Sequence, residues 1–125
     1  MSSDGSHADE VLDPGALDQL RALQRPGRPN LLARVVNLFL TDAPKQVETM
    51  RASAETGADE DLMRAAHTLK SSAANVGARA LRAECEHIEH AVRDGRVEEA
   101  RARVAETLPA LLPPVLAALE GEVAA

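Results

Sequence analysis

Apolar residues recur at steps of three and four along most of this chain of 125 residues, and that spacing is typical of amphipathic α-helices. The pattern forms one short segment followed by four longer ones, with Gly, Pro or Asn between them. We therefore expect helices at residues 14–24, 31–56, 59–76, 78–94 and from 96 to about 121.

Residues that start and stop helices support these boundaries. Asp13 is a good capping residue and Pro14 suits the first helical position, while Asn30 can cap the second helix. Glycine, which commonly ends a helix, follows three of the apolar segments, at positions 57, 77 and 95.

Prolines occur inside two of the predicted helices, where each one removes a backbone donor. The apolar stripe keeps its phase across Pro44, which favours one kinked helix over two separate helices. Pro109 and the Pro113-Pro114 pair should kink or break the last helix.

Four substantial amphipathic helices with short links predict an all-α fold. We expect an antiparallel up-and-down four-helix bundle with a short extra N-terminal helix. The bundle should span residues 13–121, and the polar residues 1–12 should form a disordered N-terminal tail.

Composition and charge narrow the class of protein. Phe39 is the single aromatic residue, and the net charge is −6, so the chain lacks the basic footprint and stacking rings of a nucleic-acid-binding protein. The lone Cys85 cannot form an internal disulfide, which suits a reducing compartment. No apolar run is long enough to cross a bilayer, and residues 1–10 lack the apolar core of a signal peptide. We therefore expect a cytoplasmic protein that binds neither nucleic acid nor membrane.

One histidine stands out on the third predicted helix. Its apolar face holds Leu62, Ala65, Ala66, Leu69, Ala73 and Val76. His67 lies about 140° from the middle of that face, at about 100° per residue, so it should face water. Lys70 follows one turn later, at the edge between the buried and exposed faces, and Met63, Ser71 and Ala74 share the side of the imidazole.

The run from Ala66 to Ala78, with His67, Lys70 and small residues up to Gly77-Ala78, resembles the signature of the histidine-containing phosphotransfer (HPt) family. That signature is His-x-x-Lys-Gly, followed by small residues and Gly-Ala. The segment from Phe39 to Pro44 is similar to the second helix of the family, and Leu81, Cys85 and Glu89 fall at family positions, so the resemblance covers roughly residues 31–104.

The resemblance implies a phosphorelay intermediate of a two-component system on a four-helix bundle. Such a domain accepts a phosphoryl group on histidine from the aspartyl phosphate of a receiver domain and passes it to another receiver. The partners would be receivers of response regulators or of hybrid sensor histidine kinases. A divalent metal would belong to the receiver. The sequence has no Gly-rich phosphate loop, so we expect no kinase or ATP site and no cofactor in this chain.

The resemblance also implies roles for individual residues. His67 would be the phosphoryl acceptor through Nε2, because a neutral imidazole is nucleophilic near pH 7. Lys70 would offset charge on the transferred oxygens, and Glu89 would orient the imidazole. The receiver-docking surface would include Met63, Ser71, Ala74 and Gly77. Ser71 departs from the family glycine, and Gly77 is alternatively just a helix stop.

Two other functions deserve comparison with phosphotransfer. The same bundle could be an adaptor that docks a receiver or kinase domain without transfer, although the presence of His67 favours transfer. Glu84 and His87 have the Glu-x-x-His spacing of di-metal bundles, but a second such motif is missing, so we expect a solvated face for them and for His90. Cys85 lies in the apolar seam of its helix and should be a small core residue.

Overall fold

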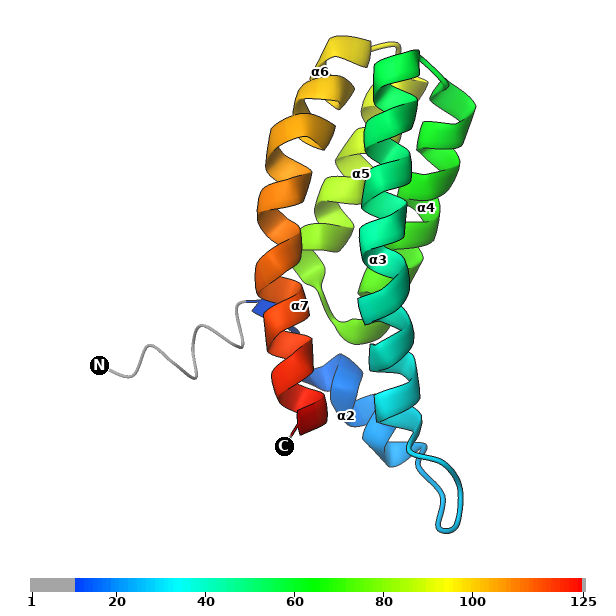
Figure 1. The fold of residues 1–125 in the computed structure, drawn as a ribbon, viewed down its shortest axis with the longest axis vertical. Helices are drawn as coiled ribbons and strands as arrows, with labels where there is room; N and C mark the ends of the chain where they lie inside the picture. The colour runs from blue at the N-terminus through cyan, green and yellow to red at the C-terminus, as the bar shows by residue number, and fades with distance from the viewer. Residues whose placement is uncertain (1–10, 125) are drawn as a thin grey trace, which may run out of the picture.

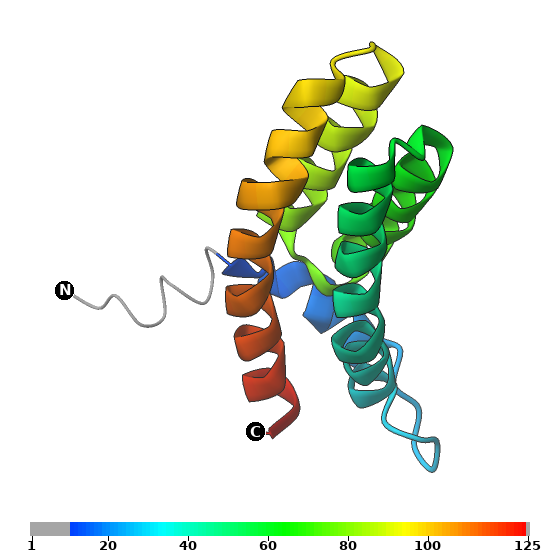
Figure 2. The same ribbon diagram turned by 45° about the horizontal axis from the view of Figure 1, so that its top comes forward.

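The computed structural model describes residues 11–124, and this part of the chain is helical without strands. Four helical rods stand side by side, each antiparallel to the one before it (Figure 1), and a shorter helix lies at one end, as the turned view also shows (Figure 2). The predicted antiparallel four-helix bundle with an extra N-terminal helix is confirmed. In chain order the elements are α2 (Pro14–Ala22), α3 (Leu31–Thr56), α4 (Asp59–Val76), α5 (Arg79–Arg93), α6 (Val97–Ala102), the π-helical turn η1 (Arg103–Thr107) and α7 (Leu108–Ala124).

The helix boundaries follow from local capping. The Asp13 side chain accepts a hydrogen bond from the Gly15 N–H at the start of α2, and Asn30 accepts one from Ala33 at the start of α3. Gly57 and Gly77 adopt left-handed φ angles of 77° and 78° directly after α3 and α4. Glycine adopts this conformation without the steric cost that other residues incur, so both helices end where the sequence predicts.

The core lies between the apolar faces of the long helices. The α4 face predicted from its periodicity is buried, and so is the α5 seam that contains Cys85. Burial of the thiol, reinforced by Glu84 and Glu89, raises the pKa of Cys85 to about 12, so this cysteine is an unreactive core residue. The helices α3 and α5 both pack extensively along α4, so α4 is held by neighbouring helices on two sides.

The prolines are accommodated without breaking a helix. The helix α3 runs unbroken through Pro44, as expected from the phase of its apolar stripe. In the last rod the irregularity precedes Pro109: the Leu108 N–H donates to the Arg103 carbonyl five residues back. This wider turn eases the clash that a proline ring makes with the preceding turn. Of the kink or break predicted at Pro113-Pro114, the structure shows no break, because α7 runs through both prolines. The carbonyls that lose their donors belong to the exposed Pro109 and Ala110, where water can reach them.

The ends of the bundle differ from the predicted limits. Leu12 was assigned to the polar tail, yet it is 5% exposed and belongs to the core. At the other end α7 continues to Ala124, beyond the expected limit at residue 121. The rest of the expected tail, residues 1–10, lies outside the described residues.

One helix meets the length and composition of a membrane span, contrary to the sequence expectation. It is the last rod, Val97–Ala124, with a mean hydropathy of 1.3 over its most apolar window. A core helix of a bundle passes the same test, and here Val104, Leu108, Val115 and Leu119 pack into the hydrophobic core. Of its most apolar window 28% is buried, so packing in the bundle accounts for part of the apolar composition of this rod.

Candidate functional site

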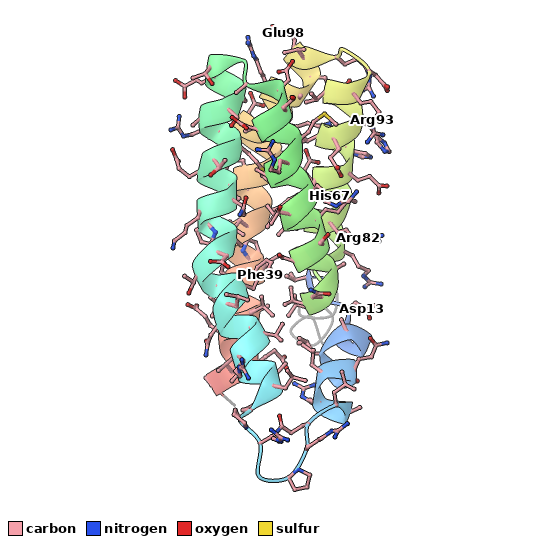
Figure 3. The ribbon with its side chains drawn as sticks, turned by 90° about the vertical axis from the view of Figure 1, so that its right-hand side faces the viewer. Asp13, Phe39, His67, Arg82, Arg93 and Glu98 are labelled. Carbon is pink, nitrogen blue, oxygen red and sulfur yellow. The ribbon has the colours of Figure 1, made fainter. Side chains whose placement is uncertain are left out.

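The imidazole of His67 stands on the outer surface of α4. Its side chain is 65% exposed, whereas the adjacent Ala66 and the following Leu69 are fully buried. Figure 3 shows His67 part-way along α4, away from both ends of the bundle. The 3.6-residue period of α4 sets this placement, because burying one face of a helix exposes the opposite face.

Glu89 of α5 reaches His67 from the neighbouring helix. Its Oε2 lies 3.3 Å from the Nδ1 atom of His67, and the Glu89 side chain is only 7% exposed. A carboxylate at this distance favours a proton on Nδ1, which leaves the Nε2 lone pair free. The expected proximity of Glu89 to the imidazole is therefore present in the structure.

Lys70 joins the same cluster through Glu89. Its Nζ atom lies 2.6 Å from Oε1 of Glu89, and the Lys70 side chain is 23% exposed. At this distance the ammonium group and the carboxylate form an ion pair. Each Glu89 oxygen thus faces a different partner, so this nearly buried carboxylate is charge-compensated.

The four residues predicted for a docking surface fall into two groups. Ser71 and Ala74 are exposed and Met63 is half-buried, one or two turns from His67 on the same side of α4. Gly77 does not belong to this surface. It is buried, and its carbonyl accepts a 2.7 Å hydrogen bond from the Asp13 N–H, so the start of α2 covers it.

In the described part of the chain, Glu84, His87 and His90 do not come together as a metal site would require. Glu84 is buried rather than solvated, because Arg103 of η1 binds it across a 2.7 Å ion pair. His87 and His90 are exposed on α5, as expected. The described residues contain no group of three or more His, Cys, Asp or Glu side chains placed to hold a metal ion.

The sequence reasoning missed several exposed residues near His67. Arg82 and Arg93 lie on α5 on the same side of the bundle as His67 (Figure 3). Leu38 is one of two large hydrophobic residues that the described part of the chain exposes, and it lines a small groove of about 100 Å³ between α3 and α4 with Thr68 and Ser72. In the sequence, Leu38 could have been noticed as an apolar residue outside the apolar stripe of α3. No local pattern distinguishes the two arginines from other surface residues.

Comparisons with known proteins identify the family of this chain. A sequence model described as the Hpt domain matches residues 34–124, well over half of the chain. The chain is 39% identical over 70 residues to histidine-containing phosphotransfer protein 5 of Arabidopsis thaliana, a match that covers 54% of this chain and 45% of that relative. The match thus spans less than half the length of the relative. This chain belongs to the Hpt domain family, whose members are phosphocarriers rather than kinases and serve phosphorelays of two-component signalling.

Proposed function

We propose that His67 is the phosphoryl acceptor of this Hpt domain. It would take the group from the aspartyl phosphate of one receiver domain and pass it to another. The observation that carries this proposal is the exposed imidazole whose Nδ1 faces Glu89, since that contact leaves Nε2 directed away from the protein. The buried, unreactive Cys85 and the absence of a nucleic-acid-binding composition support a cytoplasmic carrier of this kind.

The transfer step conserves atoms and charge without a co-reactant in this chain. The Nε2 lone pair of His67 attacks phosphorus, the N–P bond forms, and the P–O bond to the receiver aspartate breaks. The aspartate leaves as a free carboxylate with the bonding electron pair. Because Nδ1 keeps its proton, the phosphorylated ring is a cation, which the Glu89 carboxylate 3.3 Å away stabilises. The return step to a second receiver reverses these bond changes.

Phosphoryl transfer depends chiefly on placement and charge stabilisation. Lys70 holds Glu89 from the other side, so it acts on the imidazole through the carboxylate as well as through its own charge. The receiver would supply a divalent metal that offsets charge on the phosphoryl oxygens. The exposed Ser71 and Ala74 and the groove beside Leu38 leave a surface of small and apolar side chains for a transient partner.

The test is to incubate the protein with a receiver labelled with radioactive phosphate and to locate the label. We expect an acid-labile, base-stable label on the peptide that contains His67, and loss of that label to a second receiver. An acid-stable label, or a label on another peptide, would contradict the proposed acceptor. Receiver binding without any label would identify the domain as a non-catalytic adaptor.

Glu89→Ala should slow transfer at least about tenfold, because the ring then loses the group that fixes its tautomer. We expect the Nδ1 proton of the wild-type protein to redistribute over both ring nitrogens in the variant, as measured by ¹⁵N NMR of His67. Glu89→Gln is the matched control: its amide oxygen can still accept from Nδ1, so the tautomer should persist. An unchanged tautomer in Glu89→Ala would exclude an orienting role for Glu89.

Lys70→Ala should reduce both stability and transfer rate. The substitution leaves Glu89 nearly buried with only His67 beside it, which should cost roughly 1–3 kcal/mol of unfolding free energy in urea. Lys70→Arg keeps a positive charge and should lose less of both. A slower transfer at full stability would instead mean that Lys70 acts on the phosphoryl group alone, independently of Glu89.

A further inference from the structure

Two arginines near His67 carry charges without an acidic partner. Arg82 and Arg93 are exposed on α5, and within residues 11–124 neither forms an ion pair or a side-chain hydrogen bond. Many other arginines do: Arg21, Arg51, Arg64, Arg96, Arg101 and Arg103 each contact at least one Asp or Glu. Free positive charge therefore remains on α5 although the net charge of the chain is −6.

Both arginines lie on the face of α5 that approaches the acceptor. Arg82 is seven residues before Glu89 and Arg93 four residues after it, so all three project from one side of the helix. Glu89 contacts His67 directly. Figure 3 shows the two arginines on either side of His67 along the bundle, one toward each end.

The other charges of this region largely cancel. Lys70 is paired with Glu89, and Arg64 with Asp61 at 3.0 Å. Glu86 lies on the same row of α5 between Arg82 and Glu89, is half-buried, and pairs with neither arginine. On α5, two free guanidinium groups against one half-buried carboxylate leave the side of this helix beside His67 positive. On α4, the exposed Glu60 lies seven residues before His67 and is the one acidic side chain on that face of α4.

We propose that Arg82 and Arg93, the two exposed basic side chains on either side of His67, form a cationic rim. The rim attracts the acidic phosphorylation site of a receiver domain and helps to dock it, an inference that rests on the proposed function. An aspartyl phosphate, together with the carboxylates that hold a divalent cation, carries excess negative charge. A positive rim on an otherwise acidic protein attracts such a site and raises the association rate with it. The rim acts on docking, whereas His67, Lys70 and Glu89 act on the transferred group.

The experiment compares transfer from a phosphorylated receiver to the wild-type chain and to the R82E/R93E double variant. At low salt the second-order rate constant of the variant should fall about tenfold or more, and the deficit should shrink as salt screens the charges. Labelling of the variant by phosphoramidate, a small donor that needs no docking surface, should stay at the wild-type rate. Glu86→Gln should change the receiver rate in the opposite direction, because it removes negative charge from the rim.

R25E/R28E is the matched control. These arginines lie in the α2–α3 loop at one end of the bundle, are exposed, and have no acidic partner among the described residues. The control changes net charge equally and should leave receiver transfer close to wild type. The docking role of Arg82 and Arg93 would be contradicted if R82E/R93E reacted at the wild-type rate, or if both double variants lost the same amount of rate. Neither outcome would affect His67 as the acceptor. A wild-type chain that phosphoramidate labels and no receiver does would overturn the proposed function and the rim together.

Discussion

Replacing His67 by Gln is expected to abolish phosphoryl labelling by a phosphorylated receiver. The substitution removes the only ring nitrogen that the site presents to solvent beside Glu89, and an amide nitrogen has no comparable lone pair. Because the His67 side chain is 65% exposed, stability should change by less than about 0.5 kcal/mol. Labelling with radioactive phosphate and the urea unfolding midpoint measure the two quantities on the same preparation.

His87→Gln/His90→Gln is the control for this experiment. Both histidines are exposed on α5, so they are accessible to the same donor, but neither has an ion-pair contact with a buried carboxylate. The control variant should take the label at the wild-type rate. Label retained by His67→Gln and lost from the control would move the acceptor to α5.

Gly77→Ala should destabilise the fold by about 2–4 kcal/mol, through two separate costs. The left-handed φ of 78° is unfavourable for any residue with a Cβ atom. In addition, that Cβ would lie 2.5 Å from the backbone oxygen of Asp13, which has to move. Thermal and urea unfolding should both report the loss, and helix α2 should separate from the end of α4 first.

Gly57→Ala separates the two costs. Gly57 has nearly the same φ of 77°, but a Cβ there would meet no atom within 4 Å. This control should therefore show only the backbone cost of roughly 1–2 kcal/mol. Equal losses at the two positions would mean that contact with Asp13 contributes nothing. At temperatures where Gly77→Ala remains folded, its transfer rate should match the wild type, since Gly77 lies beneath α2 rather than on the docking surface.

Local signals in the sequence were sufficient to predict the bundle and the exposure of His67. Asp13 and Asn30 cap helices through contacts two and three residues away, and Gly57 ends one through its own backbone conformation. The orientation of His67 follows from the period of one helix. Each of these properties depends on neighbours in the chain, which is why a pattern of residues could reveal it.

Properties that depend on contacts between helices could not be predicted in the same way. The pairing of Glu84 with Arg103 requires α5 and η1 to be side by side, and nothing near Glu84 in the sequence distinguishes a buried carboxylate from a solvated one. The covering of Gly77 by Asp13 likewise depends on where α2 packs. Glu89 was proposed from family resemblance, but its simultaneous contact with Lys70 emerged only from the packing of α4 against α5.

The non-covalent contacts that join α4 to α5 through Glu89 have a consequence for the direction of the proposed transfer. The imidazole is already oriented before any partner arrives, so the cost of ordering it is met during folding. With His67 as the proposed acceptor, arrival and departure of the phosphoryl group would use the same arrangement of atoms. Under the proposed function, the direction of transfer would then be decided by how much phosphoaspartate each receiver holds and by the relative free energies of those phosphoaspartates.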